Sequence, residues 1–395
     1  MEKKKILKMP KAKKEGSKLK IIMLIVIIVI VTILIAMYIT DHQFRETVDV
    51  KILKKEVYEQ NDLKIDINSD NNPSICAYDK YIGDISKNVL RLYNESGKEE
   101  ANIEMMITNP IMESCGRFLI VAAQNGQNAY LVSGNSLVWQ KDIDSGNISK
   151  INDKENGYVT LILTNTDHKS VIVTISPYDN GNELFRTYLS STYALCADIS
   201  PNNKYLAIGE VDYTGTIIKS NVKIVSIEKA QVEPQNAFVY TYQSDNKQVI
   251  VNIDYQEKNK AICLFNGYIQ EITESSDRRL KDLDTENILF VDIGLEKEFI
   301  DIEKQLSGIF SYEYQMRITS TETLTETLYM VSDIPKSVKV YNKIITINFG
   351  TEIQIVNTSG WLIKRYKSSQ EIKDVIINDS IVGIVYKDRI EIVNI

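Results

Sequence analysis

The sequence predicts an all-β protein, a β-propeller of about eight four-stranded blades preceded by one transmembrane helix. Three observations lead to this prediction. One apolar run of 19 residues near the N-terminus contains no charge, glycine or proline. The rest of the chain is rich in β-branched residues and in Tyr, of which there are 22, and this composition favours strands. Eight times, at intervals of about 40 residues, a tight polar turn precedes a short apolar strand, and this spacing is the length of a propeller blade.

Composition and charge exclude several classes of protein. The 395 residues are 44% hydrophobic and 25% charged, which are the values of a folded protein. Four Cys are too few for a disulfide scaffold, and two His disfavour a His-based metal site or catalytic triad. Residues 1–20 hold nine Lys and two Glu, so this tail carries +7 and the remainder −14 of the overall −7. We therefore expect no nucleic-acid partner, because such a protein needs positive charge on its folded surface.

Residues 21–39 are the predicted transmembrane helix. A helix of this length rises about 28 Å, close to the ~30 Å hydrocarbon core of a bilayer. A cleaved signal peptide would have a shorter apolar region and a small-x-small cleavage site, and a buried core helix would show a polar face. The Lys-rich tail predicts a cytoplasmic N-terminus. We expect a single-pass signal-anchor in the plasma membrane, with the lipid bilayer as the partner of residues 21–39 and with an extracytoplasmic C-terminal domain.

The predicted domain order has four parts. Residues 1–20 are a cytoplasmic basic tail and 21–39 the membrane helix. Residues 40–74 are a juxtamembrane stalk with N-terminal strands, and 75–395 form the propeller. The last repeat unit ends one strand short, and an unfinished blade would leave strand edges open to aggregation. We therefore predict that the alternating segments between residues 48 and 67 pair with the C-terminal unit and close the ring.

The eight units support the propeller over its alternatives. The polar turns lie at 79–80, 115–117, 155–157, 202–204, 245–247, 285–287, 342–343 and 378–380. The apolar strands that follow them start at 81, 118, 158, 205, 248, 288, 344 and 381. A second turn with Gly after most of these strands makes each unit a four-stranded antiparallel meander. A parallel β-helix would need shorter coils, and a pair of sandwich domains gives no reason for eight similar units.

Two stretches of the chain are irregular. Seven blades is the alternative count, because residues 288–343 fit the repeat poorly. Short helices are expected near 277–283 and 300–306, inside the longest unit.

Several phrases of the sequence resemble known propellers. Residues 199–210, ISPNNKYLAIGE, resemble the strand-turn-strand phrase common in many propellers. Residues 135–143 and 357–366 are loosely similar to quinoprotein-like and WD40-like repeats, in which a Trp or aliphatic residue follows a Gly turn. Nearly every unit departs from the full quinoprotein core, Ala-x-Asp-x-x-Thr-Gly-x-x-x-Trp, so a quinone is not implied and no cofactor is expected.

A closer resemblance covers most of the chain. Residues 78–82, the hairpin 90–97 and the run 358–395 resemble an uncharacterised family, a domain of unknown function. Its members are membrane-anchored β-propeller-like proteins from low-G+C Gram-positive (clostridial-type) bacteria. The resemblance implies the same architecture and assigns no activity.

The sequence gives no catalytic, cofactor or metal residues. His168 lies in a polar loop, and no Gly-x-Ser-x-Gly elbow is present. The four Cys lack Cys-x-x-Cys spacing and read as small buried hydrophobes, with a Cys76–Cys115 disulfide between adjacent units as the alternative. Residues 142–147 resemble part of a calcium loop but lack its third acidic ligand and its distant Glu.

Five residues are the candidates for a binding site. Trp139 and Trp361 each follow a Gly turn, and they can either pack between blades or offer a stacking platform for a sugar. Arg278, Arg279 and Lys281 form a basic stretch on an acidic body, in what reads as a polar insertion. Long loops of this kind either bind a ligand or are solvated.

The favoured function is a binding or scaffold module in the bacterial cell envelope. The expected partner is another envelope protein or a wall polymer, with a small molecule in the central channel as a further option. The alternative is an envelope hydrolase or lyase that uses carboxylates at the channel mouth. An enzyme is the less favoured of the two, and a sensor is disfavoured because the tail has only about 20 residues.

Overall fold

The computed structural model describes residues 16–40, 44, 48, 52–53, 56–57, 63–67, 73–245, 247–256, 259–307 and 311–394. The chain divides into two units, Met1–Lys54 and Lys55–Ile395. The first unit contains α1 (Gly16–Thr40), and within it Ile21–Thr40 is long and apolar enough to cross a membrane. This stretch is 0% buried within the structure. The predicted basic tail lies mostly outside the described residues.

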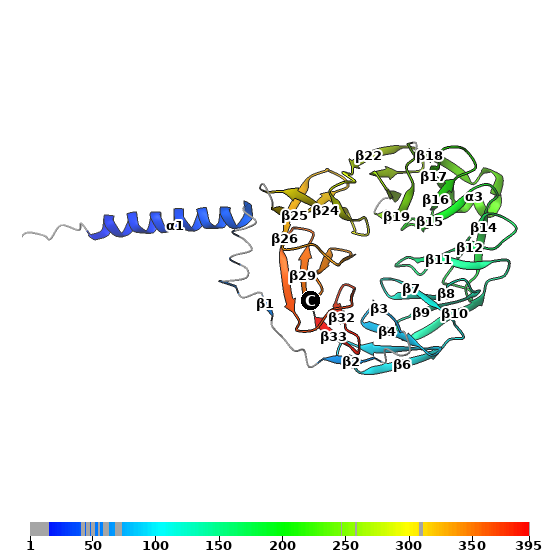
Figure 1. The fold of residues 1–395 in the computed structure, drawn as a ribbon, viewed down its shortest axis with the longest axis horizontal. Helices are drawn as coiled ribbons and strands as arrows, with labels where there is room; N and C mark the ends of the chain where they lie inside the picture. Colours follow the sequence, from blue (N-terminus) through cyan, green and yellow to red (C-terminus); the bar gives the residue numbers. More distant parts are fainter. Residues whose placement is uncertain are drawn as a thin grey trace, which may run out of the picture. The chain divides into compact units, whose positions relative to one another are not determined.

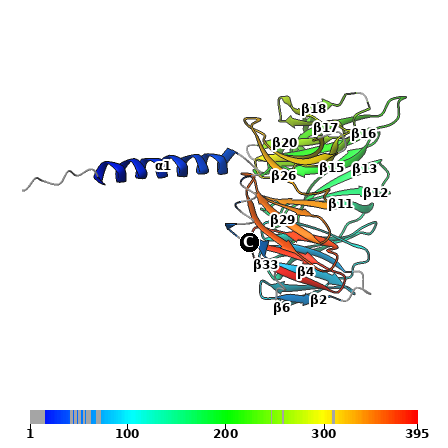
Figure 2. The same cartoon turned by 60° about the vertical axis from the view of Figure 1, so that its left-hand side comes forward.

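The second unit is an eight-bladed β-propeller, as the sequence predicts, with blades arranged around one axis (Figure 1 and, in a more edge-on view, Figure 2). Blade 1 consists of β3 (Ser74–Tyr78), β4 (Tyr81–Ser86), β5 (Val89–Asn94) and β6 (Glu99–Glu104). Blade 2 consists of β7 (Pro110–Cys115), β8 (Phe118–Ala123), β9 (Asn128–Ser133) and β10 (Ser136–Asp142). Blade 3 consists of β11 (Asn147–Asp153), β12 (Val159–Thr164), β13 (Ser170–Ile175) and β14 (Glu183–Leu189). Blade 4 consists of β15 (Tyr193–Ile199), β16 (Tyr205–Asp212), β17 (Lys219–Ser226) and β18 (Phe238–Gln243). The helices α3 (Ile227–Val232) and η3 (Pro234–Asn236) join β17 to β18.

The other four blades have the same plan. Blade 5 consists of β19 (Ile250–Gln256), β20 (Lys260–Phe265), β21 (Tyr268–Ile272) and β22 (Asp277–Asp282). Blade 6 consists of β23 (Ile288–Asp292), β24 (Glu298–Leu306), β25 (Tyr312–Ser320) and β26 (Glu326–Val331). Blade 7 contains β27 (Ser337–Tyr341), β28 (Ile344–Asn348), β29 (Glu352–Asn357) and β30 (Leu362–Lys367). Blade 8 contains β31 (Asp374–Ile377), β32 (Ile381–Val385) and β33 (Arg389–Asn394). The first strands of neighbouring blades contact one another and surround the axis.

The polar turns between the first and second strands have the backbone that their residues favour. Gly116 and Asn203 have φ of 58° and 57°, in the left-handed region. Gly reaches this region without strain, and the short polar side chain of Asn tolerates it better than most residues do. These residues reverse the chain tightly, so the strands on either side pair as an antiparallel hairpin.

The repeat pattern is out of step in blades 5 and 6. The apolar segments at 248–253 and 288–293 belong to β19 and β23, the innermost strands, whereas the matching segments of the other blades are second strands. A polar turn also connects one blade to the next, so a turn before an apolar strand does not identify that strand's place in its blade. The prediction of short helices near 277–283 and 300–306 is wrong, because these residues lie in the strands β22 and β24.

The N-terminal segment completes the last blade. The short strand β2 (Lys64–Asp66) pairs antiparallel with β33 and is the fourth strand of blade 8. The pairing predicted for the alternating residues near 63–67 is therefore present. A second short strand, β1 (Glu56–Val57), pairs in parallel with β30 and is the fifth strand of blade 7. The strand expected over 47–52 lies mostly outside the described residues.

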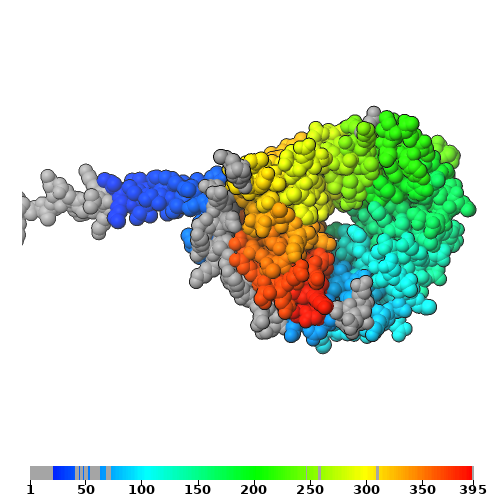
Figure 3. Space-filling model, viewed as in Figure 1, coloured from blue at the N-terminus to red at the C-terminus, as the bar shows by residue number. Residues whose placement is uncertain are grey.

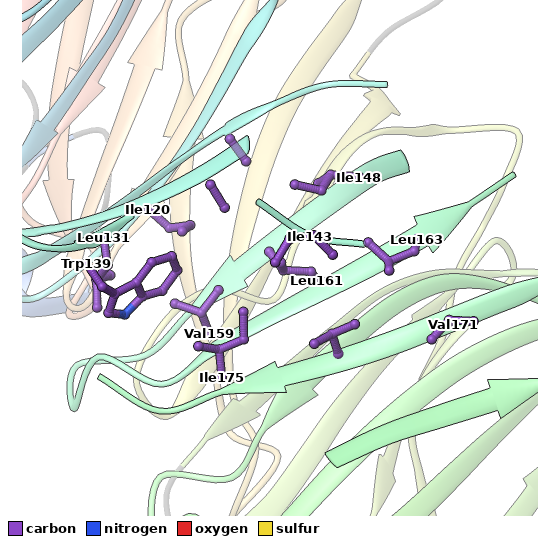
Figure 4. Packing of buried hydrophobic residues seen from close by; sticks show 13 residues of the cluster. Ile120, Leu131, Trp139, Ile143, Ile148, Val159, Leu161, Leu163, Val171 and Ile175 are labelled. Carbon is purple, nitrogen blue, oxygen red and sulfur yellow. The ribbon is translucent and has the colours of Figure 1, made fainter. Parts of the chain in front are cut away.

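The hydrophobic core lies between neighbouring blades. Figure 4 shows the cluster between blades 2 and 3, where Trp139 of β10 packs near Leu131, Val159 and Ile175. Trp139 is 1% exposed. A Cβ added to Gly181 would lie 2.9 Å from the indole ring, so Gly leaves the space that this ring occupies. Each interface of this kind buries large apolar side chains and joins one sheet to the next.

Candidate functional site

Arg278 and Arg279 lie on β22, the outermost strand of blade 5. Arg278 pairs with Glu271 at 3.0 Å and donates to the Thr321 carbonyl at 2.7 Å, which links blade 5 to blade 6. The Arg279 guanidinium lies 3.4 Å from the centroid of the Tyr268 ring and pairs with two carboxylates. The basic stretch is therefore a strand whose arginines are already bound to other groups of the chain.

Lys281 joins the same two blades through buried charge. Its ammonium lies 2.5 Å from Asp301 of β24, whose side chain is fully buried, and Arg317 pairs with the other oxygen at 3.3 Å. Burial raises the pKa of Asp301, and the hydrogen bond from Lys281 lowers it. This arrangement holds blade 6 against blade 5.

The two tryptophans have different surroundings. Trp139 is enclosed in the core, so it serves packing between blades. Trp361 is half-buried in the turn before β30, where its backbone N–H donates to Asn357 Oδ1 at 3.0 Å. The structure does not bring these tryptophans together with the basic stretch, because the five candidates lie on blades 2, 5 and 7.

All four cysteines are free, including Cys76 and Cys115. Their burial raises the pKa of both thiols, and for Cys76 the value is about 12. His168 lies in the turn after β12, where Nδ1 is 3.1 Å from Ser190 Oγ. Among the described residues, no group of three His, Cys, Asp or Glu could hold a metal ion.

The structure gathers charged side chains along the central channel, whose opening is visible in Figure 3. Lys154, which follows β11, pairs with Asp198 of β15 at 2.6 Å and with Asp254 of β19 at 3.4 Å. Asp198 also accepts the Tyr255 N–H at 2.6 Å. One lysine therefore connects blades 3, 4 and 5 at the channel.

The ion pair of Lys154 and Asp198 is strongly desolvated. Burial raises the pKa of Asp198 to about 6, although the Lys154 charge lowers it. Burial lowers the pKa of Lys154, but the carboxylates of Asp198 and Asp254 outweigh this effect and the net shift is upward. Lys154 is therefore charged, and Asp198 depends on it for compensation.

Glu113 of β7 also faces the channel. The Glu113 side chain is exposed to water, although protein atoms crowd around its carboxyl group. This burial raises its pKa to about 7, with Asp198 adding to the effect and Lys154 opposing it. Glu113 is therefore an acid of this channel whose charge changes near neutral pH.

The stability of the folded protein should depend on pH through Glu113. A carboxyl whose pKa rises from 4.5 to about 7 on folding makes the folded state less stable as pH increases between these values. We expect Glu113→Gln to leave the melting temperature unchanged at pH 4.5 and to raise it at pH 8. Thermal unfolding of both proteins from pH 4.5 to 8 measures this, and parallel pH profiles would contradict it.

A second feature is an exposed aromatic surface on the rim of blades 3 and 4. It consists of the exposed residues Tyr188, Tyr213, Ile217 and Ile218 and the half-buried Tyr193, and it is called the rim patch below. Tyr193 stacks on Tyr213 with ring centroids 5.3 Å apart. Tyr188 is 54% exposed and Ile218 48%.

The aromatic residues of the rim patch come from both blades and have further contacts at their border. At its border, the His168 ring lies 4.9 Å from the Tyr188 ring, and the Lys169 ammonium lies 5.4 Å from the centroid of Tyr193. These residues come from the β12–β13 turn, the end of β14, the start of β15 and the β16–β17 loop. Because consecutive strands of these blades run antiparallel, all four segments lie at the same end of the strands.

Sequence reasoning did not identify the channel cluster or the rim patch. Asp198 and Asp254 each lie near the end of an innermost strand, and this shared position is a signal that an alignment of the repeat units could have given. The rim patch has no local signal, because its members lie between positions 188 and 218 in separate turns and strands.

Comparison with known proteins adds the family and the fold. The sequence profile of a family of unknown function, DUF5711, matches residues 54–395. A comparison with curated proteins finds no match. Solved structures of propellers match this chain with about 10% sequence identity. Identity this low shows a shared fold and nothing more.

Examples with TM-scores above 0.5 come from three different proteins. BamB from Moraxella catarrhalis has a TM-score of 0.51 at 10% identity, with 85% of this chain and 99% of that chain covered. The C-terminal WD40 domain of Sif2 has 0.56 at 11%, with 86% and 98% covered. Chaetomium thermophilum Sqt1, solved bound to the N-terminus of the ribosomal protein L10, has 0.54 at 10%, with 85% and 100% covered.

Proposed function

This chain belongs to DUF5711, the family of unknown function, and we propose that it is a membrane-anchored scaffold of the bacterial cell envelope. In this proposal the propeller is extracytoplasmic and binds an envelope protein through the rim patch. The single observation that carries the proposal is the exposed, contiguous aromatic surface on one rim. Tyr is enriched in protein–protein interfaces, and contiguous apolar patches on soluble surfaces mark interaction sites.

The membrane anchor rests on α1 and on the charge around it. Ile21–Thr40 is long enough to cross a bilayer and is not packed against protein. Nine Lys precede residue 21, and positive residues stay on the cytoplasmic side. A retained anchor predicts that the mature protein keeps residues 21–40. Intact-mass measurement of the membrane-extracted protein tests this, and a mature form that begins after residue 40 would contradict it.

The rim patch can be tested by photo-crosslinking in cells. A photo-reactive phenylalanine at Tyr213 should crosslink one envelope protein, because this position is 47% exposed in the centre of the patch. The control position is Val232 of α3, which is 75% exposed on the same blade but at the other end of β17. The same crosslinks from both positions, or none from Tyr213, would contradict the proposal.

The hydrolase or lyase alternative has less support. Acid–base catalysis by carboxylates needs two reachable carboxyl groups with separate roles. In the channel, Glu113 is reachable, whereas Asp198 and Asp254 are both held by Lys154. This arrangement favours binding over catalysis.

A further inference from the structure

The segment that joins α1 to the propeller also completes its last two blades. In chain order α1 is followed by β1, the fifth strand of blade 7, and by β2, the fourth strand of blade 8. Figure 1 shows both strands in blue beside the orange and red strands of these blades. Since the chain passes through β1 and β2 before it reaches β3, a pull on α1 acts on these two strands before it acts on the rest of the propeller.

Both strands are held by few backbone pairs. Among the described residues, β1 pairs two residues with β30 and β2 pairs three with β33. The outer strands of blades 1 to 6 each pair five or six. Two further hydrogen bonds flank β2, one from the Ile67 N–H to the Asp388 carbonyl and one from the Ile392 N–H to the Leu63 carbonyl. Short edge elements open at a lower free energy than core strands do, so β1 and β2 are the outer strands that are most easily withdrawn.

A buried network connects the places where the two strands bind. Val57 of β1 lies opposite Tyr366 of β30. Lys64 of β2 lies opposite Glu391 of β33. The Tyr366 hydroxyl donates to the Glu391 carboxylate, and these two residues are 4% and 5% exposed. Arg389 pairs with the same carboxylate at 2.8 Å. The strands that hold β1 and β2 are therefore joined to each other, so release of one strand disturbs the site of the other.

Withdrawal of β2 uncovers only part of the seam between blades 8 and 1. Ile65 of β2 is 2% exposed, and it packs in the apolar cluster of this seam with Ile390 and Ile392 of β33. Burial of this side chain favours the closed form. The innermost strands β3 and β31 contact each other without β2. The inner part of the seam therefore stays together when β2 leaves, and β2 can return to its place.

We propose that β1 and β2 form a strap that tension on α1 releases, which opens the outer part of the seam between blades 8 and 1 before any blade unfolds. This inference rests on the proposed function, because the membrane anchor and a partner on the rim patch are the two points between which tension acts. The rim patch is on blades 3 and 4, which lie across the ring from blades 7 and 8 (Figure 1). Load between the two points therefore passes through the ring and the strap.

Pulling the full chain in detergent with optical tweezers tests this proposal. One handle is attached to a tag inserted after Thr40, and the other to a tag in the β16–β17 loop beside Gly215. This placement applies the load to the strap from the side of α1. We expect a first, reversible step that frees residues 56–73, whose contour length is roughly 60 Å, before the propeller unfolds. Unfolding of the propeller without this earlier step would overturn the proposal.

A disulfide lock identifies the strands that move in the first step. Asp66 and Arg389 are direct partners in the pairing of β2 with β33, so the oxidised variant Asp66→Cys/Arg389→Cys bonds the two strands together. Oxidation should shorten the first step by roughly half, because only the chain before residue 66 can leave, and a reductant should restore its length. Thermal unfolding of the reduced variant shows whether it is folded.

The matched control lock lies on another outer strand. Val89 and Glu104 are direct partners in the pairing of β5 with β6, so Val89→Cys/Glu104→Cys locks the outer strand of blade 1. This lock should leave the first step unchanged. Equal effects of the two locks, or no effect of the lock on β2, would overturn the proposal. The pulling experiment needs neither a bilayer nor a partner, so its failure is distinguishable from failure of the scaffold proposal.

Discussion

Replacing Ile65 with Asp should lower the free energy of unfolding of the propeller by roughly 5 kcal/mol, because it places an unpaired charge in a closed core. Ile65 is 2% exposed on β2 and packs among Ala77, Ile82, Ile390 and Ile392 of blades 1 and 8. β2 is also the strand that closes the ring. The loss should therefore appear as a large drop in the melting temperature of the whole propeller.

The neighbouring residue provides the control for this prediction. Lys64 lies on the same strand but is exposed, so Lys64→Asp should change the melting temperature little. Thermal unfolding of both variants by circular dichroism measures the difference. A normal melting temperature for Ile65→Asp would show that β2 does not hold the ring together.

Replacing Lys154 with Met should cost about 3–5 kcal/mol of stability, because it leaves the carboxylate of Asp198 buried without its partner. Asp198 is 0% exposed, and Lys154 lies 2.6 Å from it. The double variant Lys154→Met/Asp198→Asn removes both charges and should recover much of this loss. Denaturant unfolding of the two single variants and the double variant measures the coupling.

The pH dependence separates lost charge compensation from lost packing. Burial already raises the pKa of Asp198, and loss of Lys154 raises it further. The folded Lys154→Met protein gains stability as pH falls and Asp198 takes up a proton. Its deficit relative to the unaltered chain should therefore shrink between pH 8 and pH 5. A deficit that is constant with pH would assign the loss to packing.

The sequence predicted the architecture well because propeller blades have local signals. Turns such as Gly116 and Asn203 need particular backbone conformations, and the apolar strands beside them form the interfaces between blades. The closing strand near 63–67 followed from the missing strand of the last unit. The place of β19 and β23 in their blades could not be read locally, because connections between blades use the same polar turns.

The candidate sites were not predictable in the same way. Arg278 and Lys281 read as an exposed basic loop, but they form a strand whose charges are met by acids of other strands. The contact between Lys154 and Asp254 joins residues 100 positions apart through ring closure. The rim patch depends on which turns share one end of the strands. These are properties of the assembled ring rather than of any local pattern.

The most direct test of the scaffold proposal is affinity purification of the tagged full chain from solubilised membranes, with quantification of the recovered proteins. The double variant Tyr213→Ser/Ile218→Ser removes the centre of the rim patch, and thermal unfolding checks that it remains folded. The proposal predicts one envelope protein recovered near one copy per chain, and at least tenfold less of it with the variant. Equal recovery of the same proteins with both chains would contradict it.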